Sequence, residues 1–283
     1  MKKKTSIVLF MLAGILMADF TSEFQDARKR MNQKKYAEAG RLFDKLSETA
    51  PRPALKDQCN SLSAEALAMQ GKHAEAEEKA ARIQDRALKN LTLMKILMQQ
   101  KKYSDLLEKY GNEDFSQYPD SIAAGAYEIR GTAGLNSKTT RDTGIRDLYS
   151  AAELITGNDL KKDSILGKIM ENSYWRKDSK NLRKSAELIL AGKPFPSWGT
   201  WLTAHLYLAE LEIGEGALDQ ALKHADAISS RNDTYGAWKY RVRGDVFLKQ
   251  GKKDEAIAEW KKGVEIKGYM KKSLQSRLDK AGK

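Results

Sequence analysis

The amino-acid sequence contains a pattern that recurs about every 36 residues. Each copy has a polar turn and then a helical run in which a small or aliphatic residue is followed, four places later, by an aromatic residue or Ala. The pairs are Ala39/Phe43, Ala76/Ala80, Leu106/Tyr110, Ile145/Tyr149, Leu182/Ala186, Ala221/Ala225 and Ala256/Trp260. The first members are spaced by 37, 30, 39, 37, 39 and 35 residues. Such a period predicts stacked supersecondary units that bury a continuous core only against their neighbours.

Two further features indicate that each unit is a pair of helices. Twelve residues before each first member stands a mostly small or flexible residue, where a first helix would let its partner approach closely: Ala27, Ala64, Met94, Ala133, Met170, Ala209 and Gly244. The chain has only 5 Pro, and all of them fall between the proposed units, where a missing N–H costs no helical hydrogen bond. Ala, Leu, Lys, Glu and Arg, which are good helix formers, dominate the rest. The sequence therefore predicts an all-α chain.

The pattern resembles the tetratricopeptide (TPR) repeat, a helix-turn-helix unit of 34 residues. The last unit carries the pattern at Gly244, Phe247, Gly251, Ala256 and Trp260, and the first unit carries it at Tyr36, Ala39, Phe43 and Pro51. Units four and five depart from it, because unit four has a long polar turn over 136–143 and unit five has no Gly before Ser179. The resemblance implies a right-handed α-α superhelix of about seven units over 19–267. The alternative, a generic helical bundle, would show no common period.

Both ends of the C-terminal half carry distinct signals. Residues 268–283 place Met270, Leu274 and Leu278 on one helical stripe and lysines away from it, which predicts a basic C-terminal capping helix. Residues 192–200 are the segment richest in Pro and Gly. We expect a bend there, between a longer N-terminal lobe and a shorter C-terminal lobe.

The N-terminus has the pattern of a secretory signal peptide. Three lysines precede an apolar stretch over 7–17, and the small residue Ala18 follows it. The stretch is shorter than a bilayer span, which favours cleavage after Ala18 over an uncleaved membrane anchor. Since no Cys lies near this point, attachment of a lipid to a mature N-terminal Cys is excluded. We expect a periplasmic or secreted protein that is not a lipoprotein.

The residues that could carry chemistry are few. The single Cys59 and the three His residues leave little for a zinc site or a nucleophile pair, and no hydrolase, metalloprotease or phosphate-loop motif occurs. Acidic pairs such as Glu210/Glu212 are interpreted as solvated helix surface, because residues two apart on a helix do not face each other. We predict a non-enzymatic protein with no cofactor and no metal. Cys59 is expected to be buried.

Histidine and tryptophan residues are expected mainly to pack. His205 lies beside apolar stripes and is predicted to be a core or groove histidine bonded to a neighbour, whereas His73 and His224 are expected to be exposed. All five Trp residues fall after residue 174, which raises the possibility of stacking platforms for sugars or bases. Trp201 and Trp260 nevertheless occupy packing positions.

One helix face in the last unit is the candidate contact surface. By the resemblance, the face of the first helix that lines the concave groove would present four residues, Trp238, Arg241, Asp245 and Lys249. The first hypothesis is therefore an exported scaffold or adaptor of the bacterial cell envelope that binds a protein or peptide in this groove.

The charge distribution supports a second hypothesis. The formal net charge is +12, and removal of 1–18 leaves 47 Lys/Arg against 38 Asp/Glu, or +9. Residues 236–283 hold 14 Lys/Arg against 6 Asp/Glu, so most of the excess is C-terminal. A candidate basic patch comprises Lys261, Lys262, Lys267, Lys271 and Lys272. This end is either a solvated cap or a binding module for an anionic polymer, a glycan or a membrane surface. The export signal argues against nucleic acid, and the sequence leaves the oligomeric state and the partner's identity open.

Overall fold

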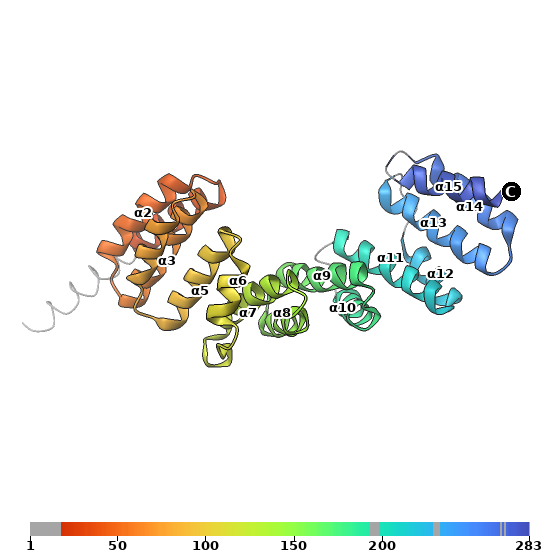
Figure 1. Ribbon diagram of the computed structural model, residues 1–283. Coiled ribbons are helices and arrows are strands. Elements are labelled where there is room, and N and C mark those ends of the chain that lie inside the picture. The colour runs from red at the N-terminus through yellow and green to blue at the C-terminus, as the bar shows by residue number, and fades with distance from the viewer. Residues whose placement is uncertain (1–17, 193–197, 229–232, 267, 269, 283) are drawn as a thin grey trace, which may run out of the picture. The chain divides into compact units, whose positions relative to one another are not determined.

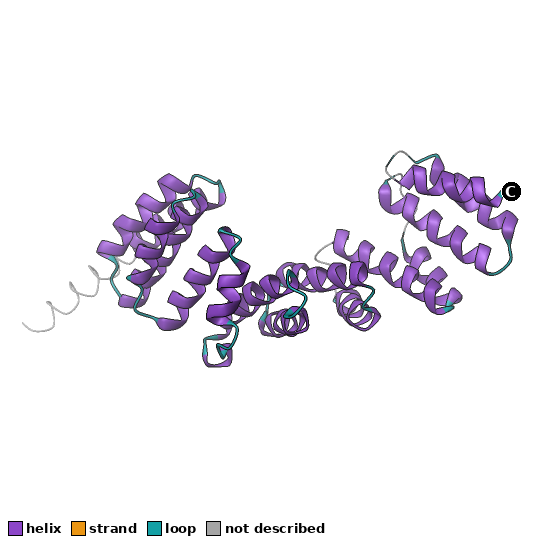
Figure 2. Cartoon of the chain, in the orientation of Figure 1, coloured by secondary structure: helices purple, strands orange, loops and turns teal. Residues whose placement is uncertain are grey.

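The structure, a computed structural model, describes residues 18–192, 198–228, 233–266, 268 and 270–282. These residues form α-helices and one short 3-10 helix, with no strand among them (Figures 1 and 2). The chain divides into two compact units, Met1–Leu154 and Ile155–Lys283. No helix within the described ranges is both long enough and apolar enough to cross a bilayer. The predicted signal peptide lies almost wholly outside the described residues.

The helices alternate as seven pairs, whose first and second members we call A-helices and B-helices. The A-helices are residues 18–32, α3 (Pro53–Met69), α5 (Arg86–Gln99), α7 (Asp120–Leu135), α9 (Asp159–Arg176), α11 (Trp198–Glu215) and α13 (Thr234–Lys249). The B-helices are α2 (Tyr36–Thr49), α4 (His73–Ala81), α6 (Tyr103–Tyr110), α8 (Arg141–Leu154), α10 (Ser179–Ala191), α12 (Leu218–Ala227) and α14 (Lys253–Val264). η1 (Phe115–Gln117) precedes α7, and α15 (Met270–Ala281) follows the last pair. The all-α fold class and the count of seven pairs are confirmed.

The packing within each pair follows the predicted pattern. All fourteen residues of the B-helix anchor pairs are buried, and none is more than 9% exposed. The seven residues predicted to admit a close partner on the A-helices are buried as well. Gly244 shows the reason, because a Cβ added there would lie 2.3 Å from Nε1 of Trp260 on α14. The indole packs directly on the α13 backbone.

Pair four departs from the family pattern because its two helices meet through glycines. A Cβ at Gly144 of α8 would lie 2.8 Å from the carbonyl oxygen of Gly131 and 3.0 Å from the carbonyl carbon of Gly134, both on α7. A Cβ at Gly131 would in turn lie 2.8 Å from the Gly144 oxygen. The backbones therefore pack more closely than an Ala contact would allow.

A buried ion pair also fixes pair four. Arg130 of α7 donates two hydrogen bonds to Asp147 of α8, at 2.7 and 2.9 Å, and both side chains are less than 10% exposed. The same guanidinium donates to the carbonyl oxygens of Tyr110, at the end of α6, and of Glu113, in the turn that follows, and it lies over the Phe115 ring at 4.4 Å. Each donor that is buried thus has an acceptor, as a buried cation requires.

The turns between A- and B-helices share one backbone feature. In six of them the residue two places before the B-helix has a positive φ of 56–82°: Lys34, Gly71, Lys101, Lys177, Gly216 and Gly251. Lys177 occupies the position where the fifth unit lacks the expected Gly. The left-handed conformation costs a residue with a Cβ about 1–2 kcal/mol, which the surrounding helix contacts must offset.

The predicted capping helix is confirmed as α15. Met270 and Leu274 are buried, and Leu274 lies against Gly263 of α14. The bend expected at 192–200 stays a prediction, since residues 193–197 lie outside the described residues. Cys59 is fully buried as predicted, and burial raises the pKa of its thiol to about 11.

We predict that Gly144→Ala destabilises the N-terminal unit by about 1–3 kcal/mol, because the added methyl overlaps backbone atoms that cannot rotate away. Gly40→Ala is the matched control: it is also a buried glycine of a B-helix, but its Cβ would lie 3.5 Å from the Ala66 Cβ, an ordinary contact. This variant should be neutral or more stable by up to about 1 kcal/mol. Urea denaturation followed by circular dichroism measures both. Equal midpoints for the two variants would contradict the glycine contact.

Candidate functional site

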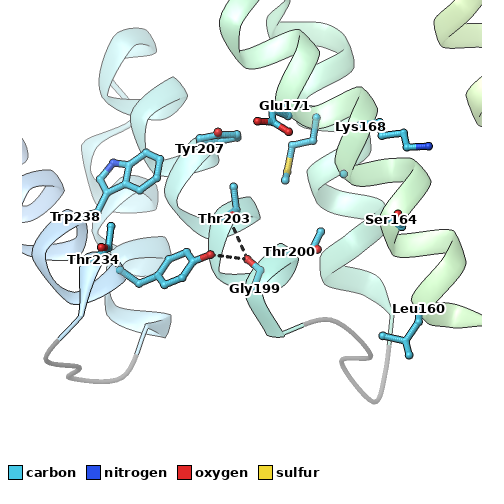
Figure 3. Close-up of a pocket in the computed structure, with 13 residues that line it drawn as sticks. Leu160, Ser164, Lys168, Glu171, Gly199, Thr200, Thr203, Tyr207, Thr234 and Trp238 are labelled. Atoms are coloured by element: carbon cyan, nitrogen blue, oxygen red, sulfur yellow. Dashed lines mark hydrogen bonds between the residues drawn. The ribbon is translucent and has the colours of Figure 1, made fainter. Parts of the chain in front are cut away.

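A groove of about 730 Å³ crosses the A-helices of the last three pairs, α9, α11 and α13 (Figure 3). The lining residues are Leu160, Ser164, Gly167, Lys168, Met170, Glu171, Gly199, Thr200, Thr203, Tyr207, Thr234, Tyr235 and Trp238. All of them belong to the C-terminal unit. We call this hollow the A-helix groove.

Small side chains keep the groove open. Ser164 of α9 is exposed and Thr203 of α11 is half-buried. Gly167 of α9 adds no side chain, and a Cβ there would lie in ordinary contact with the Thr200 methyl group, at 3.4 Å. Thr203 donates its hydroxyl proton to the Gly199 carbonyl oxygen at 2.9 Å, which holds its side chain close to its own helix.

Aromatic rings form one side of the groove. Tyr207 of α11 and Trp238 of α13 meet edge to face, with ring centroids 5.6 Å apart and planes at 65°. In Figure 3, Trp238 and Ser164 lie on opposite sides of the hollow. Each ring presents apolar surface, and its side chain has only two χ angles. A ligand can therefore bind the rings with little loss of side-chain conformational entropy.

Glu210 of α11 holds this aromatic side in place. Its carboxylate accepts hydrogen bonds from the Tyr174 hydroxyl of α9, at 2.5 Å, and from the Trp238 indole N–H, and it pairs with Arg241 of α13. One carboxylate therefore links three successive A-helices. The interpretation of Glu210 and Glu212 as solvated surface is wrong, because neighbouring helices cover both; Glu212 is only 5% exposed.

The four residues of the predicted contact surface have different surroundings. Trp238 lines the A-helix groove, whereas Arg241 pairs with Glu210. Asp245 accepts two hydrogen bonds from Arg277 of α15, at 2.6 and 2.9 Å, and Lys249 donates to the Ile213 carbonyl oxygen at 3.0 Å. The groove thus receives Trp238 alone, and the other three join α13 to adjacent helices.

The two Arg–carboxylate pairs repeat at the period of the fold. Arg241 reaches the carboxylate of Glu210 on the preceding A-helix, and Arg277, 36 residues later, reaches Asp245 in the same way. α15 therefore occupies the place of a further A-helix. Lys280 stands where the earlier A-helices have Ala209 or Gly244, and it is exposed. Among the described residues no B-helix packs on α15 at this position, and the lysine is solvated.

The predicted basic patch lies on α14 and α15, outside the groove lining. Lys261, Lys271 and Lys272 are exposed, and Lys262 forms an ion pair with Glu259 at 2.6 Å. Lys267 lies outside the described residues.

Comparison with known proteins bears on the fold. Residues 198–283 match a family model described as a tetratricopeptide repeat-like domain. The C-terminal part of a TPR repeat-containing protein from Cytophaga hutchinsonii matches 89% of this chain and 98% of its own, at 15% identity and a TM-score of 0.59. The chain has a TPR-like helical-repeat fold. A TPR protein from Parabacteroides merdae matches 93% of this chain and 99% of its own, at 14% identity and a TM-score of 0.42. No curated protein matches.

TPR-like repeats stack into extended surfaces that serve as interaction scaffolds. In this TPR-like chain, Trp201 and Trp260 are buried as predicted, but Trp175 and Trp198 are 71% and 47% exposed. The sequence pattern does not distinguish the exposed Trp198 from the buried Trp201. The two rings stack on one helix with centroids 5.0 Å apart.

A pair of histidines joins the two helices of pair six. Nδ1 of His205 on α11 lies 2.9 Å from Nδ1 of His224 on α12, and the Trp201 ring covers His205 at 4.2 Å. The predicted bonded core histidine is confirmed. His224 and His73 are half-buried rather than exposed; Nε2 of His224 lies 3.5 Å from Glu212, since α12 packs against α11.

We predict that His205 makes the C-terminal unit sensitive to acid. Burial, with a smaller effect from His224, lowers the pKa of His205 from 6.5 to about 4. The folded protein therefore favours the neutral imidazole. The stabilisation that this provides is fully present above pH 6.5 and is lost as the pH falls toward 4. At about 1.4 kcal/mol per pKa unit, the loss is on the order of 3 kcal/mol.

The free energy of unfolding, measured between pH 7 and pH 4 for wild type and His205→Gln, tests this. The difference in the free energy of unfolding between wild type and His205→Gln should become smaller as the pH is lowered. His73→Gln, in the N-terminal unit, should keep the wild-type dependence. Parallel curves for wild type and His205→Gln would contradict the prediction.

Proposed function

We propose that this chain is a non-enzymatic exported scaffold that binds a protein or peptide segment in the A-helix groove. The observation that carries the proposal is the preformed aromatic side of the groove. Tyr207 and Trp238 project into it, and Glu210 fixes the indole through a hydrogen bond. A surface that is ordered before binding loses less conformational entropy on association.

The groove chemistry favours a peptide segment over a small metabolite. Its hydroxyl groups, on residues such as Ser164 and Thr200, can bond a peptide backbone, while the rings accept apolar side chains. The lining includes one basic residue, Lys168, and one acidic residue, Glu171, so no net charge of the lining selects the ligand. A volume of about 730 Å³ accommodates several residues of an extended chain.

We predict that Ser164→Trp abolishes capture of the partner, because Ser164 is exposed on the groove side and an indole there fills the hollow without touching the core. Glu187→Trp, at an exposed position of α10 outside the groove lining, is the matched control. Crosslinking followed by mass spectrometry compares wild type with both variants. A protein retained by wild type and by Glu187→Trp, but lost with Ser164→Trp, supports the groove.

Equal retention by all three proteins would refute the groove proposal. If capture is instead insensitive to Ser164→Trp and disappears at high salt, the second hypothesis gains support. In that hypothesis the exposed Lys261, Lys271 and Lys272 bind an anionic polymer, glycan or membrane surface.

We also propose that the chain is exported and that cleavage follows Ala18. The N-terminal hydrophobic core supports this cleavage position, since the core begins just after Ala18. Phe20 is 8% exposed and stacks on Phe24 at 6.0 Å, and Phe24 meets Phe43 of α2 edge to face at 5.7 Å. Cleavage after Ala18 would leave all three rings in place.

We predict that the full chain, expressed in a Gram-negative host, accumulates in the periplasm or the medium with Asp19 as its first residue. Cell fractionation and the intact mass of the purified protein measure this. A variant with Lys2, Lys3 and Lys4 replaced by Glu should accumulate inside the cell, because the signal loses its positive region. A wild-type product that retains Met1 would contradict cleavage.

A further inference from the structure

A second hollow, of about 530 Å³, lies beside the A-helix groove in the C-terminal unit. Its lining includes Tyr174 and Trp175 of α9, and Leu211 and Gly214 of α11. The Tyr174 ring stacks on Tyr207 of the groove lining, with centroids 3.8 Å apart and planes at 3°. The two hollows therefore share a wall of stacked rings. We call the second hollow the Trp175 pocket.

The Trp175 pocket is mainly apolar and open. Trp175 is 71% exposed, the largest exposure of any bulky apolar side chain in the described part of the protein. Leu182 of α10 is buried and Leu211 is half-buried, so aliphatic groups extend the indole surface inward. At Gly214 an added Cβ would meet no atom within 4 Å. An exposed apolar surface with room beside it is typical of an interaction site.

Cations flank the pocket. Arg176, Lys177 and Lys180 follow the indole within five residues, and all three are exposed. None of them forms an ion pair with another described residue. Asp178 lies among them, and its carboxylate accepts a hydrogen bond from the Asn181 backbone N–H at 3.1 Å as the N-cap of α10.

Lys180 is an exposed cation two residues after the N-cap Asp178. It lies in the first turn of α10, where the helix dipole disfavours a cation, and this turn contains no acidic residue. Lys177 and Lys180 therefore place positive charge beside the hollow, and Glu210, the one carboxylate of its lining, is already paired with Arg241. An anionic ligand would be attracted to this rim.

We propose that the Trp175 pocket docks a peptide segment in which a bulky apolar side chain is flanked by Asp or Glu residues. The apolar side chain enters between the indole and Leu211, and the acidic neighbours pair with Lys177 and Lys180 at the rim. This site is separate from the A-helix groove and does not depend on the groove binding anything.

A library of short random peptides, displayed and selected against the purified protein at low salt, tests the proposal. The enriched peptides should combine an aromatic or aliphatic residue with two or more acidic ones. For a synthetic peptide made from the enriched sequence, replacement of Asp and Glu by Asn and Gln should weaken binding about tenfold or more, and so should high salt. Fluorescence anisotropy measures the affinities.

Substitutions at one position separate the pocket from the rest of the surface. Gly214→Phe should weaken the selected peptide about tenfold or more, because its ring occupies the hollow. Gly214→Ala is the matched control and should bind like wild type. Trp175→Ser and the double variant Lys177→Glu/Lys180→Glu should both weaken binding, whereas Ser164→Trp, which fills the A-helix groove, should not. Circular dichroism checks that each variant is folded.

Three results would overturn the proposal. The first is selection that enriches no acidic, apolar sequences. The second is a selected peptide that binds Gly214→Phe as well as it binds Gly214→Ala. The third is loss of peptide binding in Ser164→Trp alone, which would assign the peptide to the A-helix groove. Sedimentation with phosphatidylglycerol vesicles that requires Trp175 and Lys177, with no peptide enriched, would replace the peptide by an anionic lipid surface.

Discussion

Close contact between the two helices of each pair is the constraint on which the structure depends. An isolated pair cannot bury its apolar side chains, so each A-helix must admit its own B-helix on one side and a neighbouring pair on the other. In the last pair Gly244 lets the Trp260 indole rest on the α13 backbone, and in pair four Gly131 and Gly144 bring two backbones together. Residue size at these few positions sets the spacing of the helices.

Hydrogen bonds and ion pairs between successive A-helices fix the relative positions of helices that pack through apolar side chains. Glu210 joins α9, α11 and α13, and Asp245 joins α13 to α15 through Arg277. Because hydrogen bonds and ion pairs require particular donor and acceptor positions, they fix the relative placement of helices that apolar contact alone would leave freer to slide. The same links hold Trp238 and Tyr174, which line the two hollows. Fold stability and the proposed binding surfaces therefore share residues in this unit.

Much of the fold could be predicted because seven successive units place residues of similar size at the same packing positions. Each anchor pair, from Ala39/Phe43 to Ala256/Trp260, is buried as expected. The candidate site was harder to predict, because a groove-facing residue and a residue that pairs with a neighbouring helix have the same helical spacing. Trp238 and Arg241, three residues apart, both bond Glu210, but only Trp238 also lines the groove. The sequence indicated Trp175 only as one of five C-terminal Trp residues, and it gave no sign of a role for Lys180.

The sequence by itself determined the helical class, the seven pairs, the buried anchors and the capping helix, since these depend on periodicity and side-chain size along the chain. Only the tertiary structure decided which polar residues face a hollow and which form hydrogen bonds or ion pairs with neighbouring helices. Glu210 illustrates the difference: its neighbours in the sequence are those of a solvated helix surface, but its three hydrogen-bonding partners lie 28 to 36 residues away. Contacts over that separation arise from the stacking of pairs, which the local pattern does not record.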